Sequence, residues 1–152
     1  MSLQVKQVKS RSELRTFIRF PLRLYRDNPY YVPALFMDEV QTLDWRKNPS
    51  FEHCDARYWL AYDGNQVVGR IAGIINHKHI LKWDEPYMRF GWFDFVDDTE
   101  VSRALLSAVE NWAREQGLTA LHGPLGFTDL DREGMLIEGF KEVGTLATLY
   151  NF

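Results

Sequence analysis

The hydrophobic and polar positions at the start of the chain predict a strand followed by a helix. Apolar residues recur over residues 3–8 as in a short strand. Ser10 and Glu13 then match a capping box, in which both side chains accept hydrogen bonds from free backbone N–H groups at a helix start. Apolar residues follow at helical spacing. Pro21 should kink or end this helix near Phe20, because proline donates no N–H and crowds the preceding turn.

Residues 27–50 contain a weak helical pattern with a loop-like stretch before it and another after it. Residues 27–33 contain two prolines, and a residue before a proline is pushed away from helical dihedral angles. Residues 35–45 carry apolar positions compatible with a helix, and residues 47–50 interrupt the pattern again. We therefore expect an extended loop, a short helix and a second loop.

The middle of the chain has the strongest strand pattern. Three segments are rich in β-branched and aromatic residues: 58–62, 66–76 and 87–96. Asp63-Gly64-Asn65 is a turn signal between the first two, because glycine tolerates a positive φ. Gly69 and Gly73 indicate a bulge or a close backbone approach. The third segment is apolar on both faces, as in a central strand that is covered on both sides.

The second half predicts one long amphipathic helix and further strands. Residues 97–100 open the helix, an apolar stripe runs over residues 101–116, and Gly117 supplies its end. A short strand is predicted over residues 119–124, a loop over 125–144 and a last strand from residue 145. This order predicts an α/β (α+β) fold with a mixed sheet and flanking helices.

Composition and charge narrow the classes of protein. The chain has 152 residues, the usual length of one domain, which we place at residues 1–152. A net charge of -3 without a basic run argues against nucleic-acid binding, and no segment resembles a signal peptide or a membrane span. Cys54 is the only cysteine, which favours a reducing, cytoplasmic location. The 14% aromatic content favours a bulky core, with an aromatic-lined groove as the alternative.

Several segments together resemble the GCN5-related N-acetyltransferase (GNAT) fold, and in particular a bacterial GNAT-like family of longer proteins. They are Asn28-Pro29-Tyr30-Tyr31-Val32-Pro33, residues 61–72, Gly91-Trp92-Phe93-Asp94, Gly123-Pro124 and Leu136-Ile137-Glu138-Gly139-Phe140. The resemblance implies that this chain is the N-terminal portion of such a protein. It also implies a fold that is incomplete at its C-terminus, ending before the last helix and closing strands. The uncovered sheet edge predicts self-association into a homo-oligomer, such as a dimer.

The resemblance also implies where an acyl-CoA, such as acetyl-CoA, binds. In that fold its pantetheine pairs with the end of the central strand, and its pyrophosphate lies at the start of the following helix. Here these positions correspond to Phe95, Val96, Asp97, Ser102 and Arg103. This slot has no glycine and holds three carboxylates, which suit helix capping better than phosphate binding.

In the reaction that the resemblance implies, a carboxylate takes a proton from an amine acceptor, and two carboxylates are candidates for this base. Asp94 follows the aromatic run near the end of the central strand, and Glu138 lies between apolar residues. Burial would make Glu138 basic enough to work near neutrality. The alternatives are a strand-end carboxylate bonded to a loop for Asp94 and a structural hydrogen bond for Glu138.

Other reactive residues form weaker patterns. His77 and His79 lie on one face if their segment is extended, and with Asp84 or Glu85 they would make a partial metal site, although histidine pairs in polar loops are common. His122 is at a predicted strand end, where it is more often structural. The resemblance to the GNAT fold implies an acyl-CoA-dependent N-acyltransferase with a small-molecule amine or peptide acceptor. The alternatives are a non-catalytic GNAT-like module that binds a ligand or partner, and a structural assembly domain.

Overall fold

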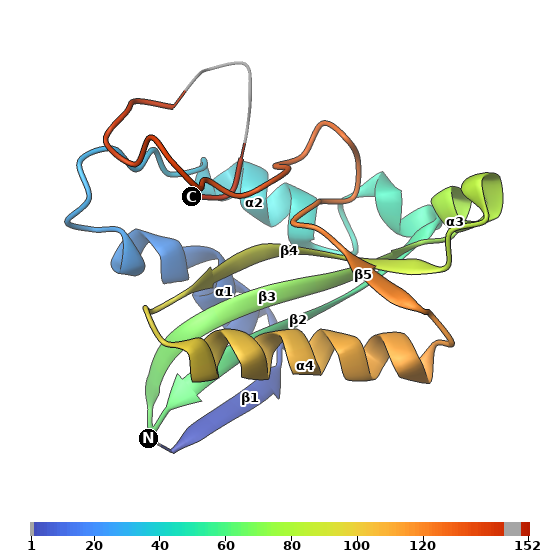
Figure 1. Ribbon diagram of the computed structural model, residues 1–152, viewed down its shortest axis with the longest axis horizontal. Helices are drawn as coiled ribbons and strands as arrows, with labels where there is room; N and C mark the ends of the chain where they lie inside the picture. The colour runs from blue at the N-terminus through green and yellow to red at the C-terminus, as the bar shows by residue number, and fades with distance from the viewer. Residues whose placement is uncertain (1, 145–149) are drawn as a thin grey trace.

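The computed structural model describes residues 2–144 and 150–152, and its centre is one twisted sheet (Figure 1). The elements in chain order are β1 (Leu3–Gln7), α1 (Arg11–Leu24), α2 (Phe36–Leu43), the 3₁₀-helix η1 (Pro49–Glu52), β2 (Cys54–Asp63), β3 (Gln66–Asn76), α3 (His77–Trp83), β4 (Tyr87–Phe95), α4 (Thr99–Glu115) and β5 (Ala120–His122). The strands are ordered β1-β2-β3-β4-β5. The first four strands are antiparallel, and β5 is parallel to β4. The predicted mixed sheet with flanking helices is confirmed.

Helices cover both faces of this sheet. In Figure 1, α4 crosses in front of the strands while α1 lies behind them. The buried side chains form two clusters, one between the sheet and α4 and one between the sheet and α1 and α2. Strand β4 is therefore covered on both faces, as the sequence predicted, and β3 is buried in the same way.

The two glycines of β3 let α4 approach the strand closely. A methyl group on Gly69 would lie 2.8 Å from Leu105 Cδ1 and 2.9 Å from Val101 Cγ1, both on α4. A methyl group on Gly73 would lie 3.2 Å from the ring of Trp112 on the same helix. The close approach predicted for these glycines is confirmed.

We expect Gly69→Ala to lower the free energy of unfolding by about 1–3 kcal/mol, because the added methyl overpacks the contact between β3 and α4. Urea unfolding followed by circular dichroism would measure the loss. An unchanged unfolding midpoint would show that α4 moves away from the strand without cost and would contradict this account of the packing.

Helix α1 contains Pro21, where the sequence predicted a kink or an end. Its capping box forms as predicted, with Glu13 N donating to the Ser10 hydroxyl. The helix does not end at Phe20. It continues through a buried Pro21 to Leu24. Proline cannot donate to the carbonyl four residues earlier, which is that of Phe17. That carbonyl instead accepts a hydrogen bond from Arg70 Nη1 at 2.9 Å, so the helix tolerates the proline.

Strand β4 carries a bulge that distinguishes it from its neighbours. Asp94 pairs with Arg70 and Gly91 with Ala72, so Trp92 and Phe93 together face a single residue of β3. Trp92 has a φ of 46°, a left-handed conformation that is rare for a bulky residue. Such bulges leave one residue outside the ladder and redirect its side chain. Here the redirected residue is Trp92.

Beyond Arg89, β4 and β5 separate. The parallel pairing joins residues 87–89 of β4 to residues 120–122 of β5. The chain then passes Gly91, where Leu125 N donates to Phe90 O at 2.8 Å, and crosses to the face of α1 and α2. Among the described residues, no strand pairs with residues 91–95 on the side away from β3. This part of β4 is an open strand edge next to the bulge.

The segment after β3 forms a helix that the sequence did not predict. His77 and His79 would share a face only in an extended segment, but residues 77–83 form α3, capped by the Asn76 side chain, which accepts from His79 N. The strand predicted from residue 145 lies mostly outside the described residues, and Asn151 forms an isolated bridge with Met135.

No helix among the described residues is long and apolar enough to span a membrane. Self-association stays a prediction.

Candidate functional site

A cavity of about 540 Å³ opens on the face covered by α2, next to the bulge of β4. Its size is in the range of small-molecule sites, which are mostly apolar with a few polar groups. Apolar and aromatic side chains dominate its wall, among them Val32, Leu35, Trp92, Leu130, Tyr150 and Phe152. The aromatic-lined groove that the composition left open is therefore present.

One carboxylate in this cavity is held by the bulge itself. Glu39 projects from α2, and its Oε2 accepts a hydrogen bond from Trp92 Nε1 at 2.9 Å. The unusual backbone of Trp92 thus brings the indole N–H across to α2. The two residues fix a carboxylate at the boundary between the apolar cavity and the open edge of β4.

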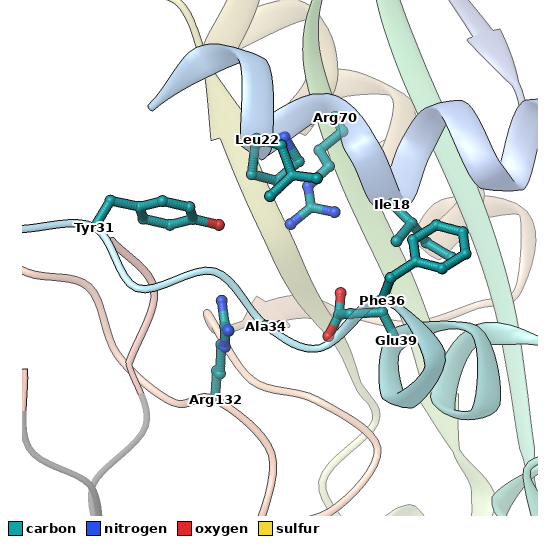
Figure 2. A pocket seen from close by; sticks show the side chains of 9 residues that line it. Ile18, Leu22, Tyr31, Ala34, Phe36, Glu39, Arg70 and Arg132 are labelled. Atoms are coloured by element: carbon teal, nitrogen blue, oxygen red, sulfur yellow. The ribbon is translucent and has the colours of Figure 1, made fainter. Parts of the chain in front are cut away.

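A smaller cavity of about 20 Å³ adjoins the large one, and the two share Tyr31, Ala34, Glu39 and Arg132 in their walls. Figure 2 shows the guanidinium groups of Arg70 and Arg132 pointing into it from opposite sides, with the Tyr31 hydroxyl and the Glu39 carboxylate on the remaining sides. Burial raises the pKa of Tyr31, and the negative charge of Asp94 adds to this. The Tyr31 hydroxyl therefore stays protonated and can donate a hydrogen bond.

Behind the small cavity lies a buried ion pair. Arg70 Nε lies 2.7 Å from Asp94 Oδ2, and Asp94 Oδ1 accepts from the Tyr25 hydroxyl at 2.8 Å. Arg70 and Asp94 are only 3% and 7% exposed. Burial, and then the neighbouring charge of Asp94, raises the pKa of Tyr25. The aromatic rings of Tyr25 and Tyr31 are 4.5 Å apart between centroids. The buried ion pair therefore supports the wall residue Tyr31 through Tyr25, which donates to Asp94.

The two candidate bases are placed very differently. Both oxygens of Asp94 already accept hydrogen bonds, from Arg70 and Tyr25. Glu138 is exposed in the loop after β5, so the burial that its proposed role required is absent. Neither lines the two cavities described above. The structure does not bring Asp94 and Glu138 together in one cavity.

The residues expected to contact acyl-CoA lie around the start of α4. Phe95 and Val96 are half-buried where β4 ends, while Asp97 and Arg103 are exposed. The half-buried Ser102 donates from its hydroxyl to Thr99 O at 3.1 Å. The Asp98 side chain caps the helix by accepting from Glu100 N at 2.8 Å. None of these residues lines either cavity described above.

The other reactive residues have structural surroundings. His77 pairs with Asp55 at 2.8 Å and His79 with Glu85 at 2.9 Å, because the helix α3 directs the two imidazoles apart. Within residues 2–144 and 150–152, no three His, Cys, Asp or Glu side chains gather as metal ligands would. His122 is exposed at the end of β5. The alternative of a structural or surface role fits each histidine.

Cys54 is a buried core residue, and burial raises the pKa of its thiol to about 11. We expect an aromatic disulfide reagent at pH 8 to modify native protein at least 100-fold more slowly than protein in 6 M guanidinium, because the thiolate is the reacting form. Absorbance of the released thiol would follow the reaction. Equal rates would place Cys54 at the surface and contradict this assignment.

Two curated proteins and a set of solved structures are similar to this chain. No family model matches the sequence. Protein YghO of Escherichia coli (strain K12) is 35% identical over 136 residues, covering 90% of this chain and 35% of that protein. A bacterial ceramide synthase of Caulobacter vibrioides (strain NA1000 / CB15N) is 33% identical over 139 residues, covering 91% of this chain and 36% of that protein. The chain thus spans about a third of the length of these curated relatives.

Solved structures share the fold at low sequence identity. A tandem GNAT protein from the clavulanic acid biosynthesis pathway matches with a TM-score of 0.62 and 18% identity, over 79% of this chain and 35% of that chain. An aminoglycoside acetyltransferase from an uncultured soil metagenomic sample, solved with sisomicin, matches with a TM-score of 0.54 and 13% identity, over 79% of this chain and 75% of that one. The fold is therefore that of the GNAT acetyltransferases, as the resemblance implied.

Sequence reasoning missed the residues that build the cavities. Tyr31 lies in the segment between Pro29 and Pro33, where an extended chain presents its side chains, so the loop itself was the signal. For Trp92 the signal was the adjacent Gly91 inside an aromatic strand. Glu39 and Arg132 carry no local pattern that separates them from surface charges.

Proposed function

We propose that this chain is the GNAT-fold part of an acyl-CoA-dependent N-acyltransferase whose acceptor is a long-chain amine. A ceramide is the amide of a fatty acid with a long-chain amino alcohol, and one relative at 33% identity is a bacterial ceramide synthase. Among the structural neighbours is a predicted acetyltransferase of Clostridium acetobutylicum solved with acetyl-CoA, with a TM-score of 0.52. Both comparisons support transfer of an acyl group from a thioester to an amine.

The observation that carries the proposal is the pairing of an apolar cavity with a fixed carboxylate beside an open strand edge. The cavity of about 540 Å³ suits an alkyl chain. Asp38, Glu39 and Asp131 in its wall outnumber the one cation there, Arg132, which favours an ammonium group. An acceptor with a charged amine and an apolar tail matches both features.

In the proposed reaction the acceptor nitrogen attacks the thioester carbonyl. A C–N bond forms, the C–S bond breaks, and CoA leaves as a thiolate that takes a proton from solvent. Before the attack, Glu39, whose carboxylate accepts from Trp92 Nε1, takes one proton from the bound ammonium group and passes it to solvent, which frees the nitrogen lone pair. After the C–N bond forms, the nitrogen loses its second proton to solvent. A backbone N–H of the bulged part of β4 polarises the carbonyl. The chain contributes mainly by aligning the two substrates.

The pantetheine of an acyl-CoA fits this chain, whereas its pyrophosphate does not. The open edge at residues 91–95 can pair with an extended pantetheine, which keeps Phe95 and Val96 as proposed contacts. The start of α4 does not fit a pyrophosphate, because Asp97, Asp98 and Glu100 are acidic and Asp98 already accepts from a free N–H. We assign no step to the pyrophosphate. Ser102 and Arg103, in the same part of α4, stay predictions from the resemblance and carry no part of this proposal.

Asp94 has a different role in this proposal from the one the sequence suggested. Its two oxygens are engaged, so it positions Arg70 and Tyr25 rather than accepting the amine proton. Glu39 takes the role of the base. Glu138, exposed in its loop, keeps the role only if Glu39 proves dispensable.

The test is to incubate the 152-residue protein with palmitoyl-CoA and octylamine. We expect a fatty amide by mass spectrometry and one released CoA thiol per amide, with no release when the amine is omitted. Binding of palmitoyl-CoA without amide formation would support the alternative of a non-catalytic module, which the acidic start of α4 favours. A lack of both binding and turnover would overturn the acyltransferase proposal.

A further inference from the structure

We propose that residues 96–103, the acidic turn between β4 and the body of α4, select against the adenine nucleotide of CoA. The preferred acyl donor is then a pantetheine thioester that lacks this nucleotide. The acidic turn directly follows the open edge of β4, which ends at Phe95 (Figure 1). The inference rests on the proposed function, since it names the class of donor that the same strand edge binds.

Backbone donors of the acidic turn already have acceptors within the protein. Val96 N donates to Val68 O at 2.9 Å, and Asp98 N donates to Val96 O at 2.6 Å. Glu100 N donates to the Asp98 carboxylate at 2.8 Å. A phosphate at a helix start is held by free backbone N–H groups. A pyrophosphate would therefore have to compete with the protein for the N–H groups of three residues in this turn.

The side chains of the acidic turn carry the same sign of charge as a nucleotide. Asp97, Asp98 and Glu100 are carboxylates, and Arg103 is the one cation in residues 96–103. The nucleotide of CoA carries a pyrophosphate and a further phosphate on its ribose. Each close pair of like charges weakens binding about fivefold even in water. The pantetheine arm is uncharged and escapes this repulsion.

The packing of α4 keeps the acidic turn close to β3. Val101 and Leu105 are fully buried and lie against Gly69, where even one methyl group would come within 2.9 Å and 2.8 Å of them. The helix cannot move back to admit a phosphate without breaking this contact. Residues 96–103 also hold no glycine, the residue that lets a backbone approach a phosphate closely.

The open edge of β4 supplies what an uncharged arm needs. Among the described residues, no strand pairs with residues 91–95 on the side away from β3. The amide groups of pantetheine can pair with such an edge as an added strand does. The affinity for the donor then comes from the pantetheine arm and the acyl chain, and the nucleotide adds only repulsion.

Three unreactive thioethers test the inference by calorimetry: S-octylpantetheine, S-octylphosphopantetheine and S-octyl-CoA. At about 50 mM NaCl we expect S-octylpantetheine to bind at least about fivefold more tightly than S-octyl-CoA. The difference should shrink at about 0.5 M NaCl, because salt screens the exposed carboxylates. If S-octylphosphopantetheine binds like S-octylpantetheine, the donor arm can be held on a carrier through its phosphate. If it binds like S-octyl-CoA, the donor is a phosphate-free thioester.

Charge reversal in the acidic turn should remove the selection. In the double variant Asp97→Lys, Glu100→Lys we expect S-octyl-CoA to bind about tenfold more tightly than in wild type, and S-octylpantetheine to bind equally well. Asp98 is kept because its side chain caps α4. Glu52→Lys, which reverses an exposed glutamate in η1, is the matched control and should change neither affinity.

The outcomes separate this inference from the proposed function. Tighter binding of S-octyl-CoA than of S-octylpantetheine would overturn the selection, while amide formation from palmitoyl-CoA would leave the acyltransferase proposal standing. An unchanged affinity of the double variant for S-octyl-CoA would overturn the role of the acidic turn. A preference for S-octylpantetheine without amide formation from any donor would support the selection and count against the enzyme. Binding of none of the three thioethers would overturn both proposals.

Discussion

Replacing Asp94 by alanine is expected to lower the free energy of unfolding by about 3–5 kcal/mol. The change leaves Arg70, which is 3% exposed, as a buried charge without its carboxylate. It also removes the acceptor of the Tyr25 hydroxyl. Urea unfolding monitored by both fluorescence and circular dichroism would give the difference in free energy.

A matched control uses the same substitution in an exposed ion pair. Arg26 and Asp27 lie 3.5 Å apart with side chains 75% and 88% exposed, so Asp27→Ala should change stability little. The double variant Arg70→Met, Asp94→Leu should lose less than Asp94→Ala alone, because no charge stays buried. Equal stability of Asp94→Ala and wild type would show that the pair at Arg70 is solvated and would contradict the buried network.

Replacing Glu39 by glutamine is expected to reduce the rate of amide formation by about 10²–10⁴-fold, the range that a positioned general base contributes. Glutamine keeps an oxygen that accepts from Trp92 Nε1, so the cavity wall should survive. Steady-state release of CoA at saturating palmitoyl-CoA would measure the turnover number. The unfolding midpoint of the Glu39→Gln variant should stay near the wild-type value.

The control for this prediction is Glu52→Gln, an exposed glutamate in η1 that should leave turnover unchanged. Turnover of Glu39→Gln within a factor of two of wild type would place the base elsewhere. Glu138→Gln would then be the next variant to measure. A folded Glu39→Gln that loses amine binding as well as turnover would instead assign Glu39 to ammonium binding.

Much of the fold could be predicted because local signals and packing agreed. The bounds of β3 follow from its apolar run and the Asp63-Gly64-Asn65 turn, and Gly117, with a φ of 71°, ends the region of α4 as predicted. At Pro21 the sequence predicted a kink or an end, and the helix does not end there, because a distant arginine donates to the carbonyl that the proline leaves free. The sequence did not predict α3, where histidines with weak propensities form a short helix capped by Asn76.

The site was less predictable, because tertiary contacts build it. Glu39 and Trp92 are 53 positions apart and meet only through the bulge in β4, which was not predicted although Gly91 marks its position. Asp94 was a candidate base by its place near the end of a strand, but its burial against Arg70 and Tyr25 depends on three separate elements and could not be predicted. Residues such as Arg132 gain a role only when the loop after β5 returns to the face of α2.

The proline in α1 has a mechanical consequence for the whole molecule. Because Arg70 takes the Phe17 carbonyl that Pro21 leaves free, the helix is fastened to β3 from within its own backbone ladder. Asp94 and Tyr25 extend that link to β4 and back to the end of α1. Helix and strands should therefore loosen as one unit, and weakening the link with Arg70→Met should accelerate deuterium uptake in α1 and in residues 91–95 together.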